Sequence, residues 1–364
     1  MWWKTRYIIY LIYKIVCVLR YIKGVYEYME SSIKKTENNI LNMLNECKLC
    51  NRICKVNRND NQIGFCNASN KVRIARASLH LWEEPPISEG NGSGTVFFSH
   101  CNLKCVFCQN HDISQGTEEN ISSDYDSNNP KINNSTNKLS VTGIEVSIER
   151  LSEIFLELQE KGANNINLVT PTHYVPQIIE ALKIAKKNKL IIPILYNTNG
   201  YDSIETIKSL NGYIDVYLPD FKYFNDKYAI KYSKANDYAS NTIKLIDEML
   251  SQVGSPKFNS NGHIIKGIIV RHLMLPGLLF DSKKVIDLIY NRYGDNIYIS
   301  LMNQYVPMFK ACDYPEINKP LNPKHYDSLI NYAVELGITN GFIQDEGTNT
   351  CDFIPNFNLE GVIQ

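Results

Sequence analysis

Three cysteines close together in the sequence have a spacing that suits chemistry at a metal. Cys101, Cys105 and Cys108 lie within eight positions. Thiolates placed like this can surround one site from a single loop, and iron–sulfur clusters are held by such thiolates. A [4Fe–4S] cluster usually takes four cysteines, so three would leave one iron open to a bound molecule. A zinc site is the alternative, as is an electron-transfer cluster closed by distant Cys312 or Cys351.

A second group of cysteines lies upstream of the first. Its four members fall within twenty residues: Cys47, Cys50, Cys54 and Cys66. Four thiolates can saturate a zinc ion or a second [4Fe–4S] cluster, and spacing does not decide between them. A structural metal that holds a small N-terminal module is the simpler interpretation, and an electron-relaying cluster is the alternative. We expect the remaining thiols, Cys17, Cys312 and Cys351, to be buried among apolar side chains.

The bulk composition narrows the class of protein. Lys and Arg total 38, as do Asp and Glu, in 364 residues, and this balance argues against a general nucleic-acid-binding surface. Bunched cysteines in a long chain are more typical of metal binding than of a disulfide scaffold, so we expect a reducing, cytoplasmic setting. The sequence has no glycine-rich dinucleotide fingerprint, so electrons are expected from an external ferredoxin or flavodoxin.

The chain divides into four parts by composition. We expect a hydrophobic, basic segment at 1–28, a cysteine-rich module at 29–90, a barrel domain at 91–350 with a disordered polar insertion at about 118–140, and a tail at 351–364. The first segment has no apolar run of the roughly 20 residues that a spanning helix needs. A membrane-surface helix, a poorly inserted anchor and a mis-assigned start before Met29 remain open for it.

Strands and helices alternate through the barrel domain, and these elements must position the cysteines. Strands are predicted at 94–99, 166–169, 190–196, 213–218, 264–274, 297–301 and 341–343. Helices are predicted at 147–161, 174–188, 202–210, 236–251, 282–292 and 324–336. This alternation predicts an α/β fold with parallel strands and right-handed crossovers, as in a partial (β/α)6 TIM-like barrel. In such barrels the chemistry lies at the C-terminal ends of the strands.

The cysteine motif and its surroundings resemble a known family. The segment GSGTVFFSHCNLKCVFCQNHDIS (92–114) places the three cysteines directly after a strand, with Phe107 before the last of them. It resembles the radical S-adenosylmethionine (SAM) superfamily, in particular an uncharacterised branch related to pyruvate formate-lyase activating enzyme. Further similar segments lie at 167–178, 196–201, 215–223, 269–277 and 300–307, so the resemblance covers roughly 45–350.

The resemblance implies a mechanism. A [4Fe–4S] cluster on the three cysteines would bind SAM at its open iron and cleave it reductively, giving methionine and a 5′-deoxyadenosyl radical that abstracts hydrogen from a substrate. In the activating enzymes this hydrogen comes from a glycine of a partner, so we expect an oxidoreductase that activates a glycyl-radical enzyme. The alternatives are a radical SAM enzyme that modifies a small molecule, a peptide or RNA, and a non-catalytic iron–sulfur electron carrier.

The resemblance also implies SAM-binding residues. Phe107 would contact the adenine, and Asn199 the ribose or the carboxylate. Asp220 and Lys222 match positions near the methionine group. Arg271 matches a basic position that pairs with the SAM carboxylate, as a guanidinium suits a carboxylate.

One turn departs from the family pattern. Most members have a Gly-Gly-Glu type of turn after the second strand, where they bind the SAM amino group. This chain has Thr170, Pro171, Thr172 and His173 there. Carbonyl oxygens and the two threonine hydroxyls can accept the same hydrogen bonds. We expect His173 to act on the substrate.

Overall fold

The structure is a computed structural model that describes residues 23, 43–116, 141–345, 347–348, 350 and 354–363. The hydrophobic segment at 1–28, apart from Lys23, lies outside these residues, as do the insertion at 118–140, Cys17 and Cys351. Within the described part of the chain, no helix has the length and apolar character needed to cross a bilayer.

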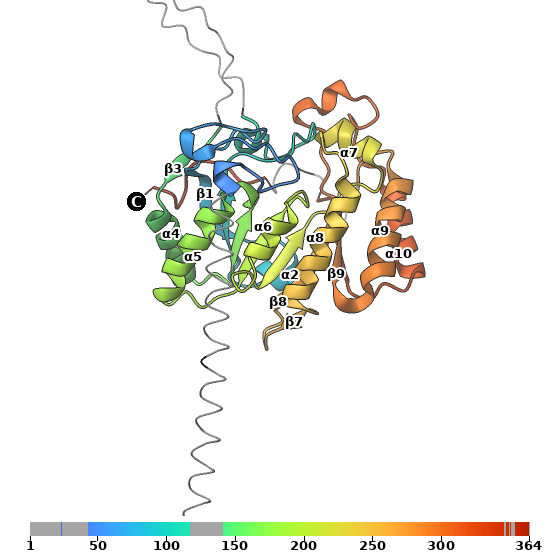
Figure 1. The fold of residues 1–364 in the computed structure, drawn as a ribbon. Helices are drawn as coiled ribbons and strands as arrows, with labels where there is room; N and C mark the ends of the chain where they lie inside the picture. The colour runs from blue at the N-terminus through green and yellow to red at the C-terminus, as the bar shows by residue number, and fades with distance from the viewer. Residues whose placement is uncertain are drawn as a thin grey trace, which may run out of the picture.

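A single mixed sheet organises the molecule (Figure 1). Its strands are β1 (Val72–His80), β2 (Ser93–Phe98), β3 (Ile144–Val146), β4 (Ile166–Val169), β5 (Ile194–Thr198), β6 (Val216–Pro219), β7 (Lys257–Phe258), β8 (Ile264–Leu273), β9 (Tyr298–Met302) and β10 (Gly341–Ile343). Their order is β10-β9-β8-β6-β5-β4-β2-β1-β3, with β7 beside β8. Every neighbouring pair from β2 to β10 along this order is parallel. The described strands do not close into a full barrel, which confirms the predicted α/β class and partial barrel.

The longer helices cover the outside of the sheet (Figure 1), and the four-residue α2 and α3 pack on its inner face. The helices are α2 (Pro85–Ser88), α3 (His111–Ser114), α4 (Ile148–Glu160), α5 (Val175–Lys187), α6 (Ile204–Ser209), α7 (Asp226–Ser233), α8 (Tyr238–Val253), α9 (Leu279–Tyr293) and α10 (Pro323–Glu335). Helix α4 illustrates why they form. The Ser147 hydroxyl accepts from the Arg150 amide at 3.1 Å and caps the first turn, while the buried Ile154 and Leu158 face the core.

The antiparallel edge of the sheet was not predicted. Strand β1 pairs with β2 on one side and with the three-residue β3 on the other. The predicted strand at 190–196 also begins late, at Ile194. Pro193 explains this, because it has no amide hydrogen to donate to a sheet ladder.

The chain segment near residue 360 packs along β1. The Leu359 amide donates to the Ala75 carbonyl at 3.0 Å, and the Ala77 amide donates to the Glu360 carbonyl at 2.8 Å. The described part of the predicted tail is therefore attached to the sheet.

Candidate active site

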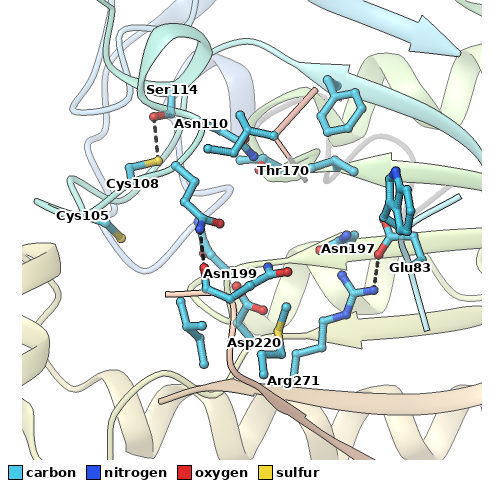
Figure 2. A pocket seen from close by; sticks show the side chains of 18 of the residues that line it. Glu83, Cys105, Cys108, Asn110, Ser114, Thr170, Asn197, Asn199, Asp220 and Arg271 are labelled. Atoms are coloured by element: carbon cyan, nitrogen blue, oxygen red, sulfur yellow. Dashed lines mark hydrogen bonds and ion pairs between the residues drawn. The ribbon is translucent and has the colours of Figure 1, made fainter. Parts of the chain in front are cut away.

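A cavity of about 330 Å³ opens where the parallel strands end (Figure 2). Its wall takes residues from the ends of successive strands: Phe98, Val169, Asn197, Arg271, Met302 and Ile343. Residues just beyond the strands, including Thr170, Asn199 and Asp220, also line it. The motif residues therefore cluster at the C-terminal ends of the strands, as the barrel interpretation requires.

The three clustered cysteines form one end of this cavity. Cys101, Cys105 and Cys108 lie on the loop between β2 and α3, and all are free thiols. Burial raises the pKa of Cys101 to about 12 and that of Cys108 to about 11, and the neighbouring thiols add to both shifts. Bound iron would offset this cost, since metals bind the deprotonated thiolate.

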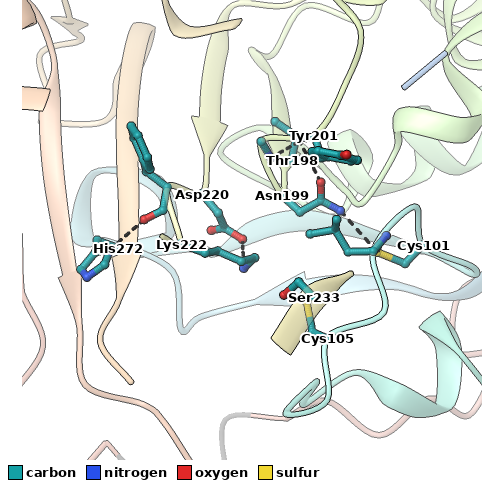
Figure 3. Close-up of polar contacts among 12 residues, drawn as sticks. Cys101, Cys105, Thr198, Asn199, Tyr201, Asp220, Lys222, Ser233 and His272 are labelled. Atoms are coloured by element: carbon teal, nitrogen blue, oxygen red, sulfur yellow. Dashed lines mark hydrogen bonds and ion pairs between the residues drawn. The ribbon is translucent and has the colours of Figure 1, made fainter. Parts of the chain in front are cut away.

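Each of the three sulfurs has a polar side-chain partner (Figures 2 and 3). The pairs are Cys101 with Asn199 Nδ2 at 3.3 Å, Cys105 with Ser233 Oγ at 3.0 Å, and Cys108 with Ser114 Oγ at 3.2 Å. No three His, Cys, Asp or Glu side chains in the described residues are arranged to hold a single metal ion. A cluster does not need that convergence, because it binds each thiolate through a different iron.

Both the nitrogen and the oxygen of the Asn199 side-chain amide form hydrogen bonds near the cysteine loop. Its Nδ2 also donates to Asn102 Oδ1 at 2.6 Å, and its Oδ1 accepts from the Tyr201 amide at 3.1 Å. The structure thus places Asn199 against the cysteine loop, where it orients Cys101. A SAM contact by Asn199 stays a prediction.

Asp220 and Lys222 form an ion pair on the cavity wall (Figure 3). Lys222 Nζ lies 2.6 Å from Asp220 Oδ2. Burial alone would lower the pKa of Lys222, but the charges of Asp220 and Cys105 outweigh it and raise the pKa. Lys222 therefore stays protonated beside Cys105, where its charge favours the thiolate.

Arg271 is paired within the protein. Its guanidinium donates to the carboxylates of both Glu83 and Glu84, including an Nε contact to Glu84 Oε1 at 2.9 Å. Only 7% of the Arg271 side chain is exposed, so these carboxylates occupy much of the group that was expected to meet SAM. Sequence reasoning missed both glutamates. Their one signal is a pair of acids between Trp82 and Pro85, in the loop that precedes α2.

The Thr170–His173 turn is only partly at the cavity. Thr170 lines it, with a φ of 57°, a left-handed conformation that is rare for a β-branched residue. Thr172 and His173 are buried behind the wall and do not line it. The His173 ring bonds the Ser99 carbonyl at 2.8 Å, and burial lowers its pKa far enough to keep it neutral. Phe107 does line the cavity.

Comparison with known proteins decides the family. The family model described as the radical SAM superfamily matches residues 95–289. The chain belongs to the radical SAM superfamily. An uncharacterized protein of Methanocaldococcus jannaschii is 30% identical over 305 residues, covering 82% of this chain and 77% of that protein.

Solved structures of Streptococcus suis SuiB are also similar. The complex with the precursor peptide SuiA has a TM-score of 0.44 at 13% identity, covering 68% of this chain and 47% of SuiB. The SAM complex has a TM-score of 0.42 at 13% identity, covering 69% and 50%. The chain thus spans about half the length of SuiB.

Membership of the superfamily brings a [4Fe–4S] cluster and SAM as cofactors. The cavity fits them by its donor set, because three free thiols lie together at one end and each has a hydrogen-bonding partner. Cys101, Cys105 and Cys108 are the thiols that we expect to hold the cluster. The cavity beside them would receive SAM.

Proposed function

We propose that this radical SAM enzyme activates a glycyl-radical enzyme by removing a hydrogen atom from a glycine of that partner. The segments similar to pyruvate formate-lyase activating enzyme support this, and they include the loop that carries Cys101 and the strand that carries Arg271. The cavity size is the observation that carries the proposal.

The cavity is small for a site that would receive SAM and a hydrogen donor together. Its volume of about 330 Å³ lies at the lower end of the range of about 300–1,000 Å³ typical of ligand pockets. SAM would fill most of it, so the hydrogen donor must be small where it enters. A glycine in an extended protein segment meets this condition, because it has no side chain.

The residues of the site have distinct parts in this proposal. The cluster and SAM, when bound, would supply the electron and the 5′-deoxyadenosyl radical. Asn199 and Ser233 would orient the Cys101 and Cys105 thiolates by hydrogen bonding. Lys222 would hold a positive charge beside Cys105, and the apolar Phe107 would exclude water from the loop side of the cavity.

The partner itself provides the test. Anaerobically reconstituted protein would be used to capture partners, and a captured protein would then be incubated with SAM and dithionite. The expected result is a glycyl-radical doublet in the electron paramagnetic resonance (EPR) spectrum of the partner. Capture of a protein without any glycine-radical segment, together with 5′-deoxyadenosine formation, would contradict the proposal.

A small molecule or peptide with a basic group is the second candidate substrate. Glu83 and Glu84 place two carboxylates beside one guanidinium, so this end of the cavity has an excess of negative charge. A substrate of this kind should stimulate 5′-deoxyadenosine formation by the natural protein and not by a Glu83→Gln variant.

A further inference from the structure

We propose that Cys47, Cys50, Cys54 and Cys66 hold a second iron–sulfur cluster, which passes electrons to the cluster in the barrel. All four are free thiols; Cys54 is half-buried and the others are buried. The proposal rests on the cofactors of the superfamily and is independent of the glycyl-radical partner.

The surroundings of these thiols repeat those of the barrel cysteines. In each group a backbone amide donates a hydrogen bond to a cysteine sulfur: Phe65 to Cys54 in the second group and Leu103 to Cys101 in the barrel group. Such hydrogen bonds stabilise a thiolate that carries metal and tune the potential of a cluster. One cysteine in each group therefore has this backbone contact.

Cys54 has a comparable arrangement. The Phe65 amide donates to its sulfur at 3.4 Å, the distance at which the Leu103 amide donates to Cys101. Gly64 keeps the space beside this sulfur open, since a side-chain carbon at Gly64 would lie 2.9 Å from Cys54 Sγ. The Cys54 sulfur therefore has the same kind of backbone donor as the Cys101 sulfur.

The arrangement of the thiols favours a cluster over zinc. Zinc needs four sulfurs at about 2.3 Å from one point. No group of three metal-binding side chains in the described residues has that convergence, and the barrel cysteines of a radical SAM protein do not have it either. The barrel group, which superfamily membership assigns to a cluster, is therefore the guide to what the second group binds.

One carbonyl oxygen connects the two cysteine groups. The Tyr201 carbonyl accepts from the Asn51 amide at 3.2 Å and from Asn102 Nδ2 at 3.0 Å. Asn51 follows Cys50, and Asn102 follows Cys101. The path between the two proposed clusters therefore runs from Cys50 through Asn51 and from Cys101 through Asn102, and the two parts meet at the Tyr201 carbonyl oxygen.

Positive charge lies between the groups. Lys104 interacts electrostatically with both Cys101 and Cys66, and the nearly inaccessible Arg58 also lies within electrostatic reach of Cys66. Two thiolate-bound clusters would bring negative charge into this region, which these cations would offset.

The proposed transfer moves one electron and no atoms. An external iron–sulfur or flavin protein is oxidised, the second cluster is reduced, and it then reduces the barrel cluster. No covalent bond forms or breaks, and no proton is required. Cys54 is the most exposed of the four cysteines, so electrons would enter on its side.

Metal analysis of the full chain tests the second cluster. Anaerobically reconstituted protein should contain about eight iron and eight sulfide atoms, and Cys54→Ser should lose about half of each. Cys312→Ser is the matched control and should lose none, because Cys312 lies outside both groups and is exposed, which shows that its predicted burial was wrong. A triple Ala variant of Cys101, Cys105 and Cys108 should keep about half, with an EPR signal that SAM does not alter.

Two results would overturn the second cluster. They are one zinc with about four irons per chain, or a disulfide among the four cysteines of the anaerobic protein. The triple variant keeps the test decisive if Cys54→Ser fails to fold, because it leaves the second group intact. None of these measurements needs a glycyl-radical partner. A negative result would therefore contradict the second cluster without bearing on the proposed function.

The relay has its own measurement. SAM cleavage by Cys54→Ser should fall strongly when reduced flavodoxin is the electron donor and much less with dithionite, which is small enough to reach the barrel cluster directly. Equal losses with both donors in a variant that keeps its barrel cluster would overturn the relay.

Discussion

The side-chain amide of Asn199 donates a hydrogen bond to the sulfur of Cys101 across 3.3 Å. Asn199 follows β5, whereas Cys101 follows β2, so this contact connects two strand ends that are separated by β4 in the sheet. It makes Asn199 part of the environment of the proposed cluster, whatever contact Asn199 makes with SAM.

Replacing Asn199 should therefore change the cluster potential. Hydrogen bonds to cluster sulfurs raise the reduction potential. A bond worth about 1 kcal/mol corresponds to about 40 mV for one electron, so Asn199→Ala should lower the potential by about that amount. An EPR-monitored redox titration measures the shift. The exposed Asn318→Ala is the control, and equal potentials in the two variants would contradict the role of this contact.

Removal of one barrel thiol should abolish SAM cleavage. Cys105→Ala takes away one of the three thiols that line the cavity in the described part of the chain, so 5′-deoxyadenosine should not form with dithionite and SAM. Cys312→Ala should keep full activity, because Cys312 does not line the cavity. Persistent activity in Cys105→Ala would show that another ligand holds the cluster.

Loss of Arg271 should destabilise the protein. Arg271→Met leaves the buried carboxylates of Glu83 and Glu84 without their cation, and breaking such a pair costs about 3–5 kcal/mol. Urea unfolding near neutral pH measures this loss. A triple variant that also carries Glu83→Gln and Glu84→Gln should recover most of it. A stability equal to that of the natural protein in Arg271→Met would contradict the importance of the pairing.

The ion pair between Arg271 and Glu84 also predicts that the stability of the protein depends on pH. Burial alone would raise the pKa of Glu84, but the charge of Arg271 outweighs burial and lowers it. A carboxyl with a lowered folded-state pKa stabilises the protein above its unfolded pKa of about 4.3, and this stability is lost as the pH falls through the folded value. The free energy of unfolding should therefore fall more steeply below that pH in the natural protein than in Glu84→Gln. Parallel curves would exclude Glu84 as the source.

The conformation of Thr170 predicts a stabilising substitution. A φ of 57° is strained for threonine and is readily adopted by glycine. Thr170→Gly should raise the free energy of unfolding by about 1 kcal/mol, while Thr170→Ala retains the strain. Urea denaturation compares the two variants, and a Gly variant no more stable than the Ala variant would show that the strain is absorbed elsewhere.

The sequence predicted the parallel part of the sheet because buried parallel strands are short apolar runs between helical patterns. The strand at 166–169 was predicted to the residue, and so was Gly341–Ile343. Strand β1 was missed: its two arginines, Arg73 and Arg76, interrupt the apolar residues. The three residues of β3 are too few for any periodicity to be visible.

The candidate site was only partly predictable, for a different reason. The three barrel cysteines are close together in the sequence, so their spacing was enough to favour an iron–sulfur site. The partners of Arg271 are not local, because Glu84 is 187 positions away along the chain. No periodicity connects two such positions, and a charged residue in a strand looks the same with or without a buried counterion. His173 was expected to act on the substrate because it follows a strand end. Its side chain is instead buried in the core, which its position in the sequence does not reveal.

The wall of the cavity takes residues from His80 to Pro355, whereas the superfamily match spans 95–289. A chain trimmed to the matched region would lack the two glutamates that neutralise Arg271, together with β9 and β10. It would contain all three barrel cysteines. However, the Arg271 side chain would lose its carboxylate partners, and the edge of β8 would be exposed to water without β9 beside it. The smallest autonomous catalytic unit of this protein is therefore larger than its homology boundaries, and expression of the isolated domain should yield aggregates.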